Sequence, residues 1–101
     1  MPITSQFNDK DNLVTIRVKG RFDFNVVQDF RHAYSDLNKP AANYVVDLGE
    51  ADYMDSSALG MLLHLWKFAG GEKAKIRLTR CNPGIKKVLE ITHFGQKFKI
   101  D

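Results

Sequence analysis

Two neighbouring hydroxyls, Ser56 and Ser57, stand directly before a strongly apolar segment, and the carboxylate of Asp55 precedes them. A serine at the start of a helix lies near unpaired backbone N–H groups and the positive end of the helix dipole, where an anion is favoured. Such a hydroxyl can cap the helix, bind an anion, or become an anion through phosphorylation. The chemistry indicated for this segment is therefore the control of negative charge at a helix start.

Residues that would carry other kinds of chemistry are scattered. No histidine has a second histidine or an acid at ligand spacing, so we expect no metal site; the histidines are His32, His64 and His93. The pair Gly70-Gly71 lacks the Lys-Ser/Thr of a phosphate-binding loop. Ser56 is not in a Gly-x-Ser-x-Gly context, and no histidine is marked as its base, so a nucleophilic enzyme is disfavoured. We expect no enzyme and no cofactor.

The charged side chains form two groups. Four carboxylates cluster in the connection before the apolar helix, namely Asp47, Glu50, Asp52 and Asp55. Acids beside a helix start usually cap the helix or solvate the loop, and we interpret them in this way. A basic row, Lys73, Lys75 and Arg77, could contact phosphates. Because no aromatic residue is interleaved with it, we interpret this row as solubilising and expect no direct nucleic-acid binding.

The bulk composition is that of one ordinary globular domain spanning residues 1–101. Apolar residues make up 44% of the chain and charged residues 27%. No apolar run approaches the roughly 18 residues of a membrane span, and the first residues do not resemble a signal peptide. We therefore expect a cytoplasmic protein without a membrane partner. The net charge of +3 permits binding to nucleic acid or to an acidic partner without requiring either.

The spacing of apolar residues predicts alternating strands and helices, and hence an α/β domain with a small mixed sheet. The expected strands are 3–7, 13–18, 44–48, 73–79 and 98–100, and the expected helices are 26–37, 56–69 and a short one opening at Asn82-Pro83. Gly20 is expected to end the second strand, and Asn25 is the expected cap of the first helix. Asp55 or Ser56 is expected to cap the second helix.

Most of the circumference of the second helix is apolar, with one exception. Ser56, Gly60, His64 and Lys67 follow one another at steps of four, four and three residues. This spacing places them on one stripe of the helix, with Ser56 at its head. We expect this stripe, called here the α-stripe, to be the only face of the helix left to solvent and to contact a partner.

The stretch Met54–Gly60, preceded by Val45–Leu48, closely resembles the signature of STAS domains, and in particular the single-domain anti-sigma factor antagonists of bacteria. Gly20-Arg21-Phe22-Asp23 resembles the Gly-x-x-Asp that follows the second strand in this family. The later landmarks at Gly70-Gly71 and Asn82-Pro83 are also similar. One departure is Ala58, where the family often has Gly. The resemblance implies the STAS fold, in which helices pack mainly on one face of the sheet.

In that family the first serine after the aspartate is phosphorylated by a partner kinase that is also the anti-sigma factor. The resemblance thus implies that Ser56 is the phosphorylation site and that Asp23 and Asp55 lie near the partner surface. Ser57 is expected to belong to the partner-binding surface as well, but to cap the helix or pack rather than to be phosphorylated. Unmodified protein would bind the anti-sigma factor and free a sigma factor. Phosphorylated protein would release it, and a phosphatase would reset the switch.

Two points stay open at the level of sequence. The regulatory partner could be a response regulator rather than a kinase, and neither the sigma factor nor the process is specified. The alternative function is that of a STAS accessory subunit of a membrane transporter complex. Such a subunit would contact its ATPase constitutively and would need no phosphorylation.

Overall fold

The computed structural model describes residues 2–36 and 40–101. Five strands form a single mixed sheet in the order β1-β2-β3-β4-β5. β1 pairs with β2 in antiparallel orientation, and the remaining neighbours are parallel. The strands are β1 (Ile3–Asn8), β2 (Leu13–Phe22), β3 (Asn43–Met54), β4 (Ile76–Thr79) and β5 (Lys99–Ile100). The predicted α/β class with a mixed sheet is confirmed.

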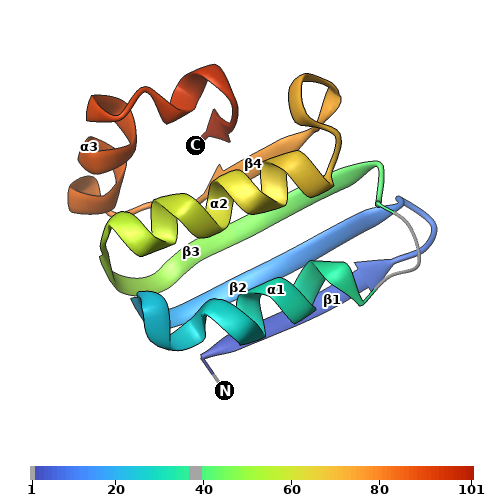
Figure 1. The fold of residues 1–101 in the computed structure, drawn as a ribbon, viewed down its shortest axis with the longest axis horizontal. Coiled ribbons are helices and arrows are strands. Elements are labelled where there is room, and N and C mark those ends of the chain that lie inside the picture. The colour runs from blue at the N-terminus through green and yellow to red at the C-terminus, as the bar shows by residue number, and fades with distance from the viewer. Residues whose placement is uncertain (1, 37–39) are drawn as a thin grey trace.

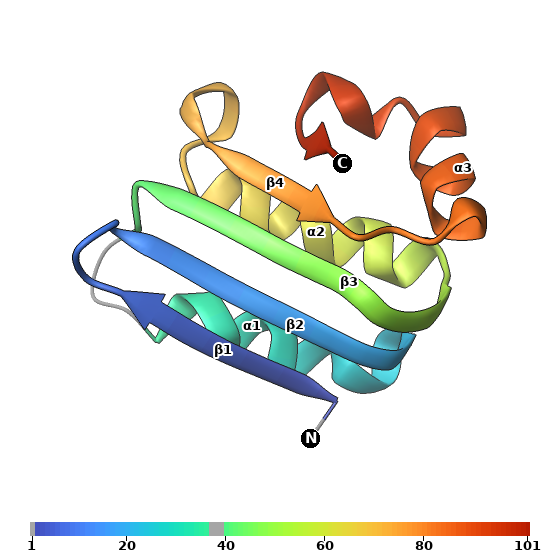
Figure 2. The ribbon, with the colours of Figure 1, turned by 180° about the vertical axis from the view of Figure 1, so that it is seen from behind.

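The helices lie mainly on one side of this sheet, as predicted. They are α1 (Val27–Ser35), α2 (Ser56–Phe68) and α3 (Pro83–Ile91), with short 3-10 turns η1 (Phe24–Val26), η2 (Gly71–Lys73) and η3 (Phe94–Gln96). Figure 1 shows α1 and α2 side by side in front of the sheet, with α3 near its β4 side. Figure 2 shows the opposite face of the sheet, in front of which no described helix lies.

The core lies between the sheet and the helices α1 and α2. Alternate residues of β2 point into it, with Val14, Ile16 and Val18 between 0% and 2% exposed. From α2 the core receives Leu62 and Leu65, both at 0%. Burying one such leucine contributes about 1.5–3 kcal/mol to the free energy of folding. The packing of α2 thereby fixes the position of its first residue, Ser56, relative to the sheet.

Both central strands are longer than the sequence predicts. β2 continues through Gly20, which has a positive φ of 78°, and β3 continues to Met54. The extensions pair in parallel, with Gly20 opposite Ala51 and Phe22 opposite Met54, after two register shifts that each place one extra residue in β3. The predicted end of the strand at Gly20 is therefore wrong. The irregular register hides the strand from a simple alternation of apolar and polar residues.

Three further predictions need correction. Asn25 is not the helix cap; instead its backbone N–H donates to Asp23 Oδ1 at 3.0 Å, and Asp23 caps η1. The strand predicted over 73–79 is β4 at Ile76–Thr79, so Lys73 lies in η2 and Lys75 directly precedes the strand. The helix predicted over 26–37 is α1 at Val27–Ser35, because Val26 belongs to η1 and Asp36 is the C-cap of α1; Leu37 lies outside the described residues.

Candidate functional site

Two aspartates lie at the same edge of the sheet because they follow neighbouring parallel strands. Phe22 at the end of β2 is paired with Met54 at the end of β3. The next residue after each strand is an aspartate, Asp23 or Asp55, and both have extended backbone. Each carboxylate caps the helical turn that begins directly after it. One edge of the domain therefore holds the starts of η1 and α2 together.

The cap of α2 is made by Asp55. Its Oδ1 accepts hydrogen bonds from the backbone N–H groups of Ser57 at 3.0 Å and Ala58 at 3.4 Å. The hydroxyl of Ser57 donates to the same oxygen, and this bond is the main reason why the pKa of Asp55 lies below its usual value. The ionised carboxylate therefore stabilises a helix start whose N–H groups would otherwise lack partners.

Ser56 and Ser57 have different environments although they are adjacent. Ser56 is the first residue of α2 and is exposed, whereas Ser57 is half-buried and its hydroxyl is bonded to Asp55. The cap bonds are made by residues on either side of Ser56. A group attached to the Ser56 hydroxyl would extend into solvent beside an anion-favouring helix terminus. The Ser57 hydroxyl already serves the cap.

The carboxylate of Asp23 is buried and makes its hydrogen bonds within the protein. Asp23 is only 8% exposed, and its Oδ2 accepts from Arg21 Nε at 3.1 Å. The guanidinium carbon of Arg21 lies 3.9 Å from the centre of the Tyr53 ring, a cation–π contact. Phe24 follows Asp23 and is 71% exposed. A partner meeting this edge would contact Arg21, Tyr53 and Phe24 more than Asp23 itself.

Sequence reasoning missed these three residues for different reasons. Arg21 and Tyr53 are 32 positions apart and meet only because β2 and β3 are paired at that point. Phe24 is visible in the sequence as a large apolar residue directly after the aspartate, and the structure leaves its side chain 71% exposed at the start of η1. An exposed aromatic residue beside an expected partner surface is typical of a protein contact.

The α-stripe lies on one face of α2, as its spacing predicts. Ser56, His64 and Lys67 are exposed, and Gly60 is half-buried with open space around its α-carbon. His64 also lines a groove of about 420 Å³ between α1 and α2. These positions place the α-stripe at the surface. Its role in partner binding stays a prediction.

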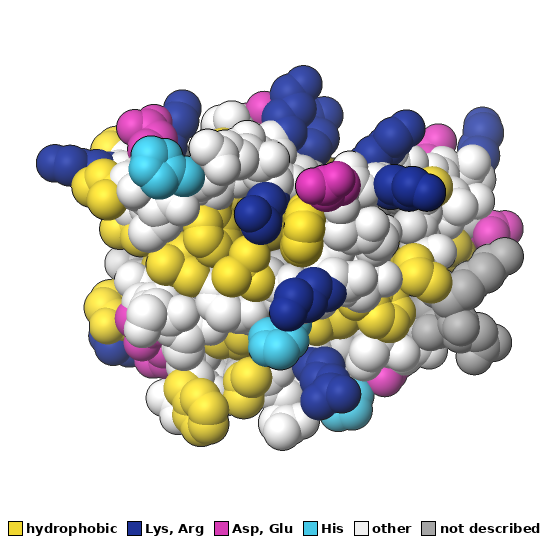
Figure 3. All heavy atoms as spheres, turned by 45° about the horizontal axis from the view of Figure 1, so that its top comes forward, with side chains coloured by type: hydrophobic (Ala, Val, Ile, Leu, Met, Phe, Trp, Pro, Cys, Tyr) yellow, Lys and Arg dark blue, Asp and Glu magenta, His cyan; other side chains and the backbone are white. Residues whose placement is uncertain are grey.

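The α-stripe is not the only open face of α2, however, so that prediction is wrong. Leu59, Leu63 and Trp66 on its flank are only partly buried, and Ile91 of α3 is 65% exposed. Figure 3 shows apolar side chains gathered on the face that includes α2 and α3, with basic side chains and histidines around them. The open surface of α2 therefore combines polar residues with an apolar flank, as protein contacts do.

Other chemistry finds little support in the described part of the chain. Among residues 2–36 and 40–101, no three His, Cys, Asp or Glu side chains lie close enough together to hold a metal ion. None of the described helices is both long and apolar enough to cross a membrane. The fold and the site define the chain as a small α/β domain with an open helix surface headed by an exposed serine.

Comparison with known proteins gives the family. A model described as Mlab, STAS domain, matches residues 5–100, and the chain therefore belongs to the STAS domain family. A STAS-domain containing protein of Pseudomonas aeruginosa (strain UCBPP-PA14) is 50% identical over 100 residues, which are 99% of each chain. The suggested resemblance to STAS domains is confirmed.

Solved structures of distant sequence share the fold. A candidate anti-sigma factor antagonist of Thermotoga maritima has a TM-score of 0.82 at 20% identity, over 97% of this chain and 84% of the other. The phosphorylated form of the Bacillus cell fate determinant SpoIIAA has a TM-score of 0.74 at 19% identity, over 98% and 90%. A sulfate transporter family protein of Wolinella succinogenes has 0.73 at 11% identity, over 93% and 88%. At these identities the likeness concerns the fold.

Proposed function

We propose that this protein is an anti-sigma factor antagonist whose binding is switched by phosphorylation of Ser56. The observation that carries the proposal is the contrast between the two serines. Ser56 is exposed at the first position of α2, while Asp55 and Ser57 make the cap around it. A kinase can therefore reach Ser56 without opening the fold. The solved structures of SpoIIAA, described in unphosphorylated and phosphorylated forms, support such a switch by analogy.

In the unmodified state, the partner would bind across the start of α2. The contact would combine the α-stripe, Asp55 and Ser57 with the partly buried Leu59 and Leu63. Apolar area at the centre of such a contact supplies the affinity, and the polar α-stripe supplies its orientation. The protein would act by binding an anti-sigma factor, and thereby free a sigma factor, rather than by catalysis.

Phosphorylation would break this contact through charge. A phosphoryl group adds about −1.5 to −2 charges at neutral pH. Burying it against a surface that fits a neutral hydroxyl costs several kcal/mol unless a cation pairs with it. Asp52 and Asp55 lie in the same segment and add negative charge there. Because about 1.4 kcal/mol changes an affinity tenfold, we expect at least about a hundredfold loss.

The remaining partners follow from the switch. A serine kinase, which can be the anti-sigma factor itself, would modify Ser56, and a phosphatase or a response regulator would reset or redirect it. These reactions would take place in the cytoplasm, where sigma factors act.

A capture experiment tests the proposal. Wild-type protein, Ser56→Ala and Ser56→Asp are used as baits, and the captured proteins are identified by mass spectrometry. We expect a sigma-regulating partner with wild type and Ser56→Ala, and its loss with Ser56→Asp. Ser57→Thr, which keeps the hydroxyl that serves the cap, is the matched control and should retain the partner. Equal capture by Ser56→Asp, or phosphate mapped to Ser57, would contradict the switch.

A transporter accessory subunit is the second candidate, and the fold shared with the Wolinella succinogenes sulfate transporter family protein favours it. The same surface of α2 would then bind an ATPase permanently. The capture experiment separates the two functions. A transport ATPase retained equally by wild type, Ser56→Ala and Ser56→Asp would support the accessory subunit and exclude the switch.

A further inference from the structure

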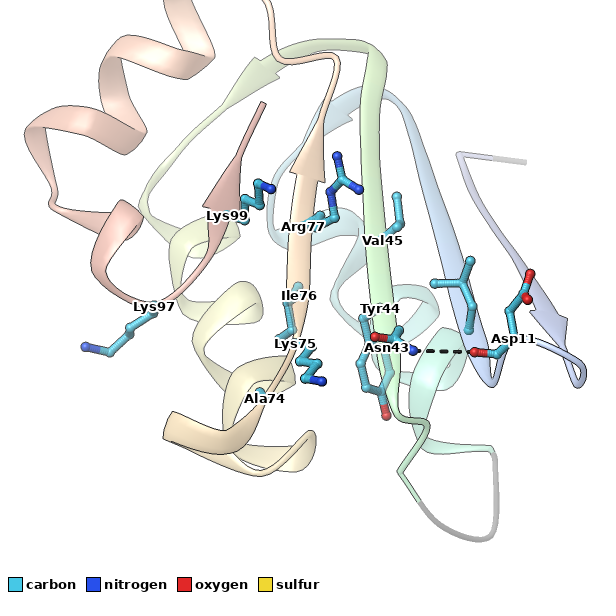
Figure 4. Close-up of a pocket in the computed structure, with 11 residues that line it drawn as sticks. Asp11, Asn43, Tyr44, Val45, Ala74, Lys75, Ile76, Arg77, Lys97 and Lys99 are labelled. Atoms are coloured by element: carbon cyan, nitrogen blue, oxygen red, sulfur yellow. Dashed lines mark hydrogen bonds between the residues drawn. The ribbon is translucent and has the colours of Figure 1, made fainter.

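A basic cavity lies on the face of the sheet that α1 and α2 leave open. Its volume is about 530 Å³, and its lining residues are Asp11, Leu13, Asn43, Tyr44, Val45, Ala74, Lys75, Ile76, Arg77, Lys97 and Lys99. Four of them are basic and one is acidic, but the Lys97 ammonium lies 5.1 Å from the Trp66 ring of α2 and points away from the other cations in Figure 4. The positive charge of the cavity therefore comes from Lys75, Arg77 and Lys99. We propose that this cavity, called here the basic groove, binds an acidic, aliphatic polypeptide segment in an extended conformation.

The strand register gives the basic groove an apolar floor and a basic side. Tyr44 and Val46 point into the core at 1% and 0% exposure, so Val45 between them faces the open side and is half-buried. Val45 is paired with Arg77, and Arg77 is paired with Lys99. Figure 4 shows Arg77 and Lys99 projecting from neighbouring strands on one side of Val45, whereas Asp11 lies across the sheet on the other side.

The spacing of the cations matches an extended chain. Lys75 and Arg77 are two residues apart, which corresponds to about 6.6 Å along a strand, and Lys99 lies about 4.8 Å across from Arg77. Alternate side chains of an extended ligand lying along β4 recur at the same 6–7 Å, so its acidic residues can meet successive cations. The aliphatic residues of such a ligand would contact Val45 and Leu13 in the floor.

The guanidinium of Arg77 is fixed by Asp101 and keeps N–H groups that can donate to a ligand. Its Nε and Nη2 donate to Asp101 Oδ2 at 3.2 and 2.6 Å. A guanidinium has five N–H donors, so three remain for a carboxylate. Because its side chain is already fixed by Asp101, binding a ligand costs less side-chain entropy than it would at a free lysine.

Two other classes of anionic partner fit less well. Single-stranded nucleic acid binds on grooves that offer aromatic rings for stacking, and the one aromatic residue in this lining, Tyr44, is 1% exposed. A membrane surface takes up protruding apolar side chains, whereas Val45 and Leu13 are half-buried in the floor of the cavity. An acidic polypeptide uses both the cations and the recessed apolar floor.

The basic groove is separate from the proposed switch. Val45 lies near the start of β3, whereas Ser56 follows the end of that strand, so at most about 30 Å of extended chain separates Val45 from Met54. Val45 faces the open side of the sheet, and Ser56 begins the helix α2, which packs on the other side. An acidic segment in the basic groove would therefore leave Ser56 accessible. The domain could hold one partner on the open sheet face while it exchanges another at α2.

The test is a titration of the ¹⁵N-labelled protein followed by heteronuclear NMR. The probe is an acetylated octapeptide of alternating acidic and aliphatic residues, in 50 mM salt, and the same peptide with glutamine in place of each acid is its control. We expect shifts of the amides of Val45, Arg77 and Lys99 with the acidic peptide. Affinity should fall at least tenfold in Lys75→Glu/Lys99→Glu and at 500 mM salt, since exposed charges are screened.

A matched variant separates local from overall charge. Lys73→Glu/Lys87→Glu changes the net charge equally at exposed positions outside the lining and should bind as wild type does. Lys75→Gln/Lys99→Gln provides a milder loss if the reversal impairs folding. Absence of groove shifts at 1 mM peptide would overturn the proposal. Equal or tighter binding of a twelve-residue oligothymidine, of pyrophosphate, or of vesicles with anionic lipid would overturn it as well.

Discussion

Arg80, the residue after β4, forms a bidentate ion pair with Asp47 in the middle of β3. Arg80 Nε lies 2.9 Å from Asp47 Oδ1, and its Nη2 lies 2.8 Å from Oδ2. The backbone N–H of Gly49 donates to Oδ1 at 2.9 Å, and Arg17 Nε lies 3.4 Å from Oδ2. Asp47 is 9% exposed, so this contact is shielded from water on the carboxylate side. It ties β2, β3 and the residue after β4 together.

This ion pair should make the free energy of unfolding depend on pH in the acidic range. The hydrogen bonds from Arg80 are the main reason why the pKa of Asp47 lies below its usual value. The stabilisation is fully present above the ordinary carboxyl pKa of about 3.9 and is lost as pH falls through the lower, folded-state pKa. We expect Asp47→Asn to lower the free energy of unfolding by about 1–2 kcal/mol at pH 7. Urea unfolding should show this difference shrinking below about pH 4. A difference that stays constant down to pH 2 would contradict the assignment.

The Arg80–Asp47 ion pair leaves no room for a side chain at Gly49. A β-carbon built on Gly49 would lie 2.6 Å from Arg80 Nε, too close for a real contact. Gly49→Ala should displace the guanidinium and destabilise the protein, as read from its urea midpoint. In an Arg80→Ala background the same change should cost little, so the two substitutions will be strongly non-additive. Additive effects would show that Arg80 is not what excludes a side chain at position 49.

Gly60→Ala is the control for these glycine substitutions. A β-carbon at Gly60 meets nothing within 4 Å, and the residue lies inside α2. Alanine is the better helix former, so we expect a gain of about 0.5–1 kcal/mol in the free energy of unfolding. A loss of stability here would show that the surface of α2 is more crowded than the contacts indicate.

The sequence predicts the elements that rest on regular apolar spacing. The apolar spacing of α2, with Asp55 as one of two candidate caps, and the start of α3 at Asn82-Pro83 agree with the structure because their signals are local. The extension of β3 to Met54 does not follow from local signals. It depends on pairing with β2 across register shifts. The acids Glu50 and Asp52 made that segment resemble a loop.

The candidate site was predictable only where it depends on local sequence, as with the fold. The position of Ser56 at the head of α2 follows from local sequence, and so does its line with Gly60, His64 and Lys67. The roles of Arg21 and Tyr53 follow from tertiary pairing and could not be predicted. The basic row was assigned in part wrongly, because Lys73 belongs to η2, while Lys99 of β5 lies beside Arg77.

Gly60→Arg should weaken partner binding without disturbing the fold. The open space around the α-carbon of Gly60 accommodates a long side chain pointing away from the core. On the partner side, that side chain would crowd the centre of the α-stripe, and we expect at least about a tenfold loss of affinity, or about 1.4 kcal/mol. Gly60→Ala serves as the matched control and should bind as wild type does. Calorimetry measures the affinity, and loss of binding only together with loss of cooperative thermal unfolding would contradict the assignment.

Phosphorylation of Ser56 should leave the domain folded, so that release of the partner comes from the surface and not from unfolding. The helix dipole favours a negative charge at the start of α2 by about 0.3–1 kcal/mol. Asp55 lies next to Ser56 and opposes that charge, which offsets part of the gain. We expect the unfolding temperature of Ser56→Asp to stay within about 4 °C of wild type, because about 1 kcal/mol corresponds to 4–8 °C at this size. Ser57→Asp should be clearly less stable, since it replaces a hydroxyl that donates to Asp55 with a second half-buried carboxylate. Scanning calorimetry of both variants measures the difference. If Ser56→Asp were the less stable of the two, the phosphate would act by opening the start of α2, and the surface mechanism would be wrong.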